Sequence, residues 1–134
     1  DMEEANRLLG YEYFVSAPVL HGNALGRTIG FPTANQIPPK EKLLPPNGVY
    51  AVHAIMNGKT YCGVCNIGRK PTVGDNYPVG IETFFFDFHG DIYDREIRVA
   101  FVKHIRPEKK FASVEELAAQ IERDKETCRK LFGL

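Results

Sequence analysis

Residues 49–64 read VYAVHAIMNGKTYCGV. In this stretch, two runs rich in β-branched and aromatic residues flank Asn57-Gly58, and such residues favour strands. Asn-Gly supplies the positive φ angles that a two-residue type I′ turn requires. The stretch therefore predicts an antiparallel hairpin.

The same pattern extends in both directions along the chain. From Tyr13 onward, short apolar runs alternate with turn signals such as His89-Gly90-Asp91. The predicted strand runs are 13–21, 48–57, 59–67, 80–88 and 92–104. The segment 36–47 holds four prolines, which cannot donate to a sheet ladder. It is therefore predicted to be a long loop.

Two segments favour helices. Residues 1–10 predict a short helix with an acidic first turn, and Gly10 ends it. Residues 113–132 predict a longer amphipathic helix, which begins with the capping box Ser113-Val114-Glu115-Glu116. The order of elements, with the strands first and one long helix last, indicates a mainly β fold, because strands and helices do not alternate as in a β-α-β pattern. We expect a small antiparallel barrel or sandwich with a helix packed outside it.

Composition narrows the function classes. A chain of 134 residues suits one domain, and its 17 Lys+Arg balance 17 Asp+Glu. Because the chain has no excess of positive charge, we expect neither nucleic acid nor anionic membranes as partners. No apolar run approaches the roughly 20 residues of a membrane span, and no signal-peptide pattern is present. We expect a cytoplasmic protein.

Cysteines and histidines show no ligand pattern. Cys62 and Cys65 form a single C-x-x-C in a strand-like run, so we interpret the three cysteines as reduced thiols. The four histidines are scattered, and none is assigned to a metal. His53 and His104 lie in predicted strands, where a structural role is expected.

The stretch 26–35, Gly-Arg-Thr-Ile-Gly-Phe-Pro-Thr-Ala-Asn, holds the residues best suited to phosphate chemistry. Its glycines let backbone amides approach an anion, and Arg27 can pair with phosphate. Thr33 and Asn35 offer oxygen ligands to a hard cation. On spacing alone, a glycine-rich turn before Pro32 explains the stretch equally well. No Walker A motif is present.

The same ten residues resemble the Pro-Thr-Ala-Asn signature of the riboflavin kinase family. Further matching blocks follow in family order at 66–72, 81–83, Tyr93 and 105–111. The resemblance implies a six-stranded antiparallel Greek-key β-barrel with a C-terminal α-helix packed outside. It also implies an enzyme that uses ATP and Mg²⁺ to phosphorylate the 5′-hydroxyl of riboflavin, giving FMN.

The resemblance assigns roles residue by residue. Glu82 stands where the family has its catalytic carboxylate. A primary alcohol is a poor nucleophile unless its proton is accepted, which explains that choice. The alternative for Glu82 is a solvated strand residue or an ion-pair partner. The other implied roles are Mg²⁺ binding by Thr33 and Asn35; nucleotide binding by Gly22, Gly26, Arg27, Gly30, Thr33, Phe85 and Tyr93; and flavin binding by Arg106, Lys109 and Phe111.

Domain organisation follows from the same resemblance. Residues 1–12 resemble the joint before the kinase module in bacterial bifunctional riboflavin kinase/FAD synthetases, which leaves 13–134 as the kinase domain. We therefore expect an N-terminal adenylyltransferase domain in the full-length protein. None of the four histidines fits the His-x-Gly-His motif of that domain. FMN adenylylation is not expected from this chain.

Two other classes of protein are alternatives to a kinase. A non-catalytic flavin- or nucleotide-binding barrel would not need Thr33, Asn35 and Glu82 together. A nucleic-acid-binding barrel of the OB type predicts a basic stripe with interleaved aromatics, and the balanced charge disfavours it.

Overall fold

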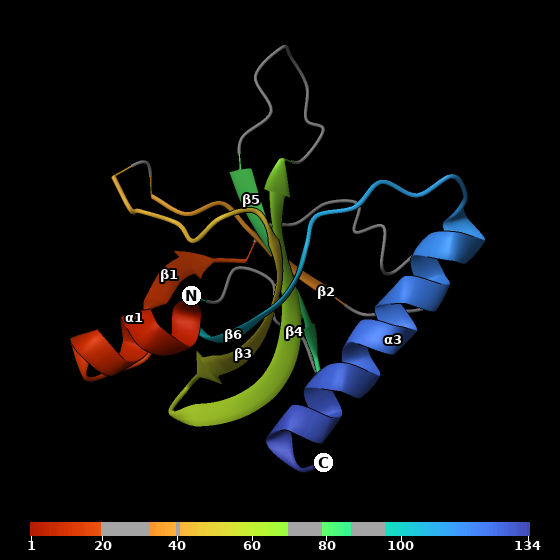
Figure 1. Ribbon diagram of the computed structural model, residues 1–134. Coiled ribbons are helices and arrows are strands. Elements are labelled where there is room, and N and C mark those ends of the chain that lie inside the picture. The colour runs from red at the N-terminus through yellow and green to blue at the C-terminus, as the bar shows by residue number, and fades with distance from the viewer. Residues whose placement is uncertain (20–32, 40, 70–78, 87–95) are drawn as a thin grey trace.

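The computed structural model describes residues 1–19, 33–39, 41–69, 79–86 and 96–134. Within these ranges, six antiparallel strands form one curled, nearly closed sheet in the order β1-β6-β3-β4-β5-β2 (Figure 1). The prediction of a mainly β barrel with a C-terminal helix outside it is confirmed. The elements are α1 (Met2–Leu9), β1 (Phe14–Pro18), β2 (Thr33–Gln36), β3 (Gly48–Met56), β4 (Lys59–Arg69), β5 (Val79–Phe85), β6 (Glu96–Pro107) and α3 (Val114–Phe132).

The predicted hairpin forms the centre of the sheet. β3 and β4 pair from Gly48↔Ile67 to Met56↔Lys59, so that only two residues connect them. Asn57 and Gly58 have φ angles of 52° and 77°, as a type I′ turn requires. The hairpin prediction is confirmed.

The strand β2 was not among the five predicted runs. It has four residues and lies within the Pro-Thr-Ala-Asn motif, where no alternation of apolar and polar residues marks a strand. It pairs with β5 alone and forms an edge of the sheet. The predicted loop 36–47 is also corrected at its start, because Gln36 is the last residue of β2. Residues 37–39 and 41–47 contain no helix or strand.

Gln36 links the two edges of the sheet. Its side chain is buried, and Nε2 donates hydrogen bonds to the carbonyl oxygens of Ala17 in β1, at 2.7 Å, and Ile97 in β6, at 2.9 Å. β2 and β1 stand at opposite ends of the strand order. One side chain therefore closes the barrel where no backbone ladder joins the strands.

We expect Gln36→Leu to lower the free energy of unfolding by about 1–3 kcal/mol, because two buried carbonyl oxygens lose a donor. The similar size of leucine keeps the cavity filled, so the loss reports the hydrogen bonds rather than packing. Urea denaturation of both proteins measures the difference. An unchanged free energy of unfolding would show that the barrel closes without this side chain.

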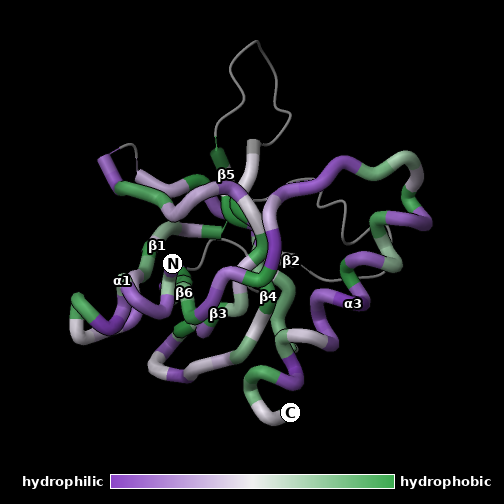
Figure 2. Tube along the Cα trace, viewed as in Figure 1, coloured by the Kyte–Doolittle hydropathy of each residue, from purple (hydrophilic) through white to green (hydrophobic). Residues whose placement is uncertain are grey.

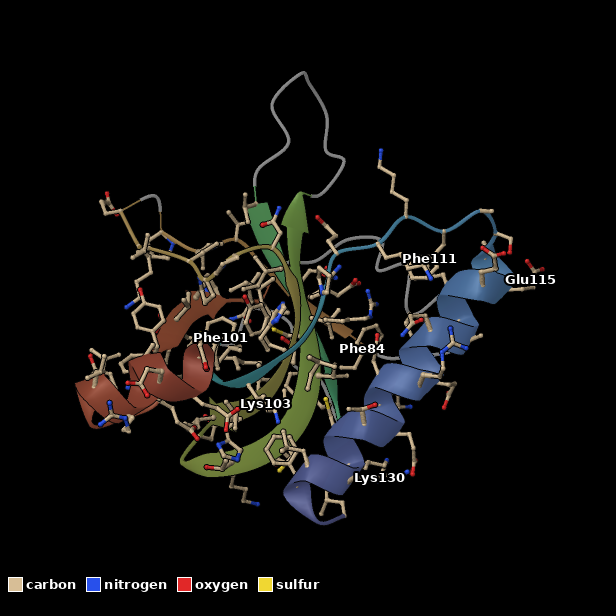
Figure 3. All side chains as sticks on the ribbon, viewed as in Figure 1. Phe84, Phe101, Lys103, Phe111, Glu115 and Lys130 are labelled. Carbon is tan, nitrogen blue, oxygen red and sulfur yellow. The ribbon has the colours of Figure 1, made fainter. Side chains whose placement is uncertain are left out.

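Apolar side chains form two clusters, one on each side of the sheet. The inner cluster fills the barrel and includes Tyr50, Ile67 and Phe101. The outer cluster lies between the sheet and α3 and includes Val49, Ala51, Val64, Phe84, Phe86, Ile121 and Cys128. Figure 3 shows Phe84 on the side of the sheet that faces α3, and Phe101 on the side nearer α1. α3 is thus held to the barrel by a core of its own.

The ends of α3 agree with the prediction of 113–132. The Ser113 hydroxyl accepts a hydrogen bond from the backbone N–H of Glu116, while the Glu116 carboxylate accepts one from Ala112 N–H. Glu115 in the first turn and Lys130 in the last suit the helix dipole (Figure 3).

Polar and apolar residues alternate along the helix (Figure 2). No helix among the described residues is long and apolar enough to cross a membrane.

The predicted structural histidines both have partners. His53 Nδ1 lies 2.8 Å from Glu12 Oε1, and the His104 ring packs edge-on against Tyr50. No disulfide joins the three cysteines, Cys62, Cys65 and Cys128. Cys128 lies in α3 and is fully buried in the outer cluster, and this burial, with the nearby charge of Asp124, raises the pKa of its thiol to about 12.

Candidate active site

Three polar residues stand side by side across neighbouring strands. Glu82 in β5 lies opposite Asn35 of β2 on one side and opposite Asn66 of β4 on the other. Directly opposite residues of antiparallel strands point to the same face, with their Cβ atoms about 4.5–5.5 Å apart. We refer to Asn35, Glu82 and Asn66 as the polar row.

The polar row lies on the outer face of the barrel, on the same side as α3. Continuing across the sheet, Asn66 is opposite Val49, which belongs to the outer cluster, and Val49 is opposite Arg106. Residues next to the row along their strands, such as Ile81 and Ile67, belong to the inner cluster. Strand alternation thus separates the row from the barrel interior.

All three residues of the polar row are half-buried. An ionised Glu82 is an acceptor only, whereas each asparagine has both donor and acceptor atoms. The Asn66 Oδ1 atom is buried and has no hydrogen-bond partner within the described part of the chain. The row therefore combines a carboxylate with one acceptor that no described residue satisfies.

A second carboxylate lies close to the row. Gly68 is two residues beyond Asn66 and shares its face, and a Cβ atom at Gly68 would lie 2.0 Å from Glu108 Oε1. Glu108 is thus placed directly over the glycine, and only the missing side chain makes room for it. The outer face therefore carries two carboxylates, from β5 and from the segment after β6.

Arg106 connects this face to α3. Its Nε atom lies 3.0 and 3.1 Å from the two carboxylate oxygens of Asp124, and a terminal nitrogen lies 2.8 Å from Oδ2. The other terminal nitrogen donates to the Pro107 carbonyl oxygen, and Gln120 donates to Asp124 Oδ1. Only 7% of the Asp124 side chain is exposed. Within the described ranges, these contacts use three of the five N–H groups of the guanidinium, which leaves two for other acceptors.

A hollow of about 290 Å³ lies at the start of α3. It is lined by Lys109, Phe111, Glu116, Ala119 and Arg123. Figure 3 shows Phe111 where the chain enters the helix. The Phe111 ring centroid is 5.8 Å from Arg106 Cζ and 5.7 Å from Lys109 Nζ. The hollow is therefore joined to the face of the polar row through Arg106.

The structure describes only part of the predicted site. Glu82 and Asn35 are brought together, and Arg106, Lys109 and Phe111 gather near the start of α3. Thr33 lies in β2 opposite Phe84, two residues from Asn35. Phe85, which the resemblance assigns to nucleotide binding, packs against the inner cluster, on the opposite face of its strand from Glu82. The predicted residues Gly22, Gly26, Arg27, Gly30 and Tyr93 lie outside the described ranges.

The donor types of the polar row fit a hard cation. Asn35 and Glu82 present oxygen atoms side by side, and Mg²⁺ prefers such ligands. Among the described residues, no group of three or more His, Cys, Asp or Glu is arranged to hold a metal. A cation here would therefore use few protein ligands, as Mg²⁺ does when it also binds substrate phosphates and water.

Sequence reasoning did not single out Asn66, Glu108 or Asp124. Asn66 belongs to the matching block 66–72, but nothing in that block shows that it lies opposite Glu82. Glu108 stands over Gly68, and the glycine itself was the available signal for a close approach. Asp124 looks like any polar residue of an amphipathic helix.

Comparison with known proteins agrees with this fold. The family model for flavokinase, or riboflavin kinase, matches residues 9–132. A bifunctional riboflavin kinase/FMN adenylyltransferase of Bacillus subtilis is 48% identical over 99% of this chain and 43% of its own length. A crystal structure from Streptococcus pneumoniae, described as a macrolide-efflux protein, is 37% identical with a TM-score of 0.87, and the match covers 96% of this chain and 42% of that one.

A riboflavin kinase structure from Trypanosoma brucei shares the fold, with a TM-score of 0.61 and 23% identity over 90% of this chain and 79% of that one. The structure is thus a six-stranded barrel with a helix outside it and the polar row on its outer face. The chain belongs to the riboflavin kinase family, and it is the riboflavin kinase domain of that family. It spans about two-fifths of the length of the curated relatives it matches.

Proposed function

We propose that this chain transfers the γ-phosphate of ATP to the 5′-hydroxyl of riboflavin, giving FMN and ADP. The observation that carries the proposal is the polar row, in which Glu82 stands between two asparagines on the face that α3 borders. A half-buried carboxylate in such a row is suited to accept the proton of an alcohol. Family membership supports the same reaction.

In this mechanism, Glu82 takes the proton as the 5′-oxygen attacks the γ-phosphorus in line with the leaving ADP. The hollow at the start of α3 receives part of the flavin. Phe111 offers an aromatic face to the ring system, and Lys109 and the two remaining N–H groups of Arg106 offer hydrogen bonds or charge. A hollow of this size encloses only part of such a ligand.

Thr33 and Asn35 would hold Mg²⁺ beside the ATP phosphates. When bound, Mg²⁺ neutralises phosphate charge that develops during transfer. Gly22, Gly26, Arg27 and Gly30 would approach the nucleotide through their backbone amides and the guanidinium, with Phe85 and Tyr93 as aromatic contacts. These assignments rest on the resemblance, and Asn35 beside Glu82 supports the metal position.

The reaction is tested by incubating the chain with riboflavin and Mg-ATP and separating the flavins by chromatography. We expect FMN to accumulate. A non-catalytic flavin-binding barrel would bind riboflavin and leave it unchanged, and a nucleic-acid-binding barrel would do neither.

The relatives are named bifunctional, and we propose that adenylylation belongs to a separate N-terminal module of the full-length protein. The sequence has no His-x-Gly-His motif, which that activity would need to act on the α-phosphate. Supplying FMN and Mg-ATP should therefore yield no FAD. Steady FAD formation, free of contaminating synthetase, would overturn the division into two modules.

We expect Asn35→Ala to raise the KM for Mg-ATP by about tenfold or more, because it deletes an oxygen ligand from a cation with strict geometry. Riboflavin affinity, measured by flavin fluorescence without nucleotide, should stay nearly constant. Asn35→Asp is the matched control, since it keeps an oxygen at the same position. An equal loss of riboflavin affinity in Asn35→Ala would indicate a local folding defect instead.

A further inference from the structure

Three buried side-chain oxygens lack a hydrogen-bond partner within the described ranges: Gln36 Oε1, Asn66 Oδ1 and Thr83 Oγ1. A buried acceptor without a donor costs about 1–3 kcal/mol, so each such atom needs a physical explanation. Two of the three have the same surroundings. Gln36 lies opposite Ile81, and Thr83 lies between Ala34 and Cys65, all inner-cluster residues. Those two oxygens face the closed interior of the barrel.

Asn66 differs from the other two in its position. It stands on the outer face, beside Glu82 and two residues from Gly68, where Glu108 reaches over the sheet. The side chain of the adjacent Val49 is buried in the outer cluster and has no donor. An unsatisfied acceptor is thus held next to the carboxylate that would activate the substrate hydroxyl.

We propose that Asn66 binds the ribityl chain of riboflavin, with its side-chain oxygen accepting a hydrogen bond from a ribityl hydroxyl. This inference rests on the proposed function and adds a substrate-binding residue to the same site. The ribityl chain must reach Glu82 at its 5′ end, so its hydroxyl groups pass the neighbouring positions of the polar row. A polyol supplies donors there, whereas the flavin ring supplies almost none. The contact therefore selects for the polyol and orients its terminal hydroxyl toward Glu82.

The test compares riboflavin with lumiflavin, which has the same ring system but a methyl group in place of the ribityl chain. Asn66→Leu removes the acceptor while keeping similar volume. We expect the Kd for riboflavin, measured by flavin fluorescence, to rise about 5- to 30-fold, and the Kd for lumiflavin to change less than about twofold. Asn66→Thr, which keeps an oxygen and suits a strand, should recover part of the loss.

Stability separates this role from a structural one. Replacing an unsatisfied acceptor by an apolar group of similar shape is neutral or stabilising, so Asn66→Leu should unfold at the same or a higher urea concentration. Thr83→Val is the matched control: it removes another unsatisfied oxygen, from the inner face, and should leave both flavin affinities unchanged.

Three results would overturn the inference: an unchanged riboflavin Kd in Asn66→Leu, an equal loss for both flavins, or a clear loss of stability. If the unsubstituted chain forms FMN in those cases, the proposed function survives and only the role of Asn66 is lost. A chain that binds no riboflavin and forms no FMN would remove the proposed function itself.

Discussion

Glu82→Gln should lower turnover of riboflavin by about 10²–10⁴-fold while the KM values for riboflavin and Mg-ATP change little. Glutamine keeps the size and the hydrogen-bonding capacity of the side chain but cannot accept a proton. The polar row should stay intact, because the asparagines on both sides can pair with an amide. Steady-state kinetics with FMN detection measures the effect.

Glu96→Gln is a suitable control, since Glu96 is an exposed carboxylate at the start of β6, opposite Pro18. It should leave turnover unchanged. Near-normal turnover in Glu82→Gln, at an unaltered free energy of unfolding, would rule out Glu82 as the proton acceptor and return it to the role of an ordinary strand residue.

Breaking the Arg106–Asp124 pair should have the largest effect on stability. Asp124→Ala leaves a largely buried guanidinium without its main acceptor, and we expect the free energy of unfolding to fall by about 2–4 kcal/mol. Denaturant unfolding measures this loss. The double variant Arg106→Met/Asp124→Leu should recover much of it, because an apolar pair carries no desolvation cost. A double variant as unstable as the sum of its single changes would contradict this explanation.

Cys128 reports whether the same pair holds α3 against the barrel. Its thiol is fully buried, and its pKa of about 12 keeps it protonated near neutral pH, so alkylation requires the helix to open. Arg106→Met leaves the charge of Asp124 in place, and we expect alkylation of Cys128 to speed up by about tenfold or more. An unchanged rate would show that the outer cluster alone holds the helix.

The sequence was most informative where local chemistry decides structure. The Asn57-Gly58 turn, the capping box at Ser113 and the stop at Gly10 each follow from the conformations of a few adjacent residues, and all three are confirmed. β2 was missed because four residues beside glycines and a proline give no periodic signal. Its strand form depends on pairing with β5, which is a contact across some 50 positions.

The site was predictable as a set of residue types but not as an arrangement. The resemblance named Glu82 and Asn35, yet only the register of β2, β5 and β4 shows that Asn66 completes their row. Arg106 was predicted to contact flavin, and the carboxylate that holds it lies 18 positions away on a helix. Its flavin contact stays a prediction, with two N–H groups left to make it. Pairings of this kind depend on tertiary packing, which residue types alone do not encode.

Position-specific labelling of ATP tests the central claim most directly. Riboflavin is incubated with the chain, Mg²⁺ and ATP labelled at either the γ- or the α-phosphorus, and the flavins are then separated. Transfer from the γ-position predicts one labelled phosphate in each FMN from γ-labelled ATP and no labelled flavin from α-labelled ATP. Two results would contradict the account. In the first, a folded chain leaves riboflavin unlabelled in both incubations, and in the second, labelled flavin forms from α-labelled ATP.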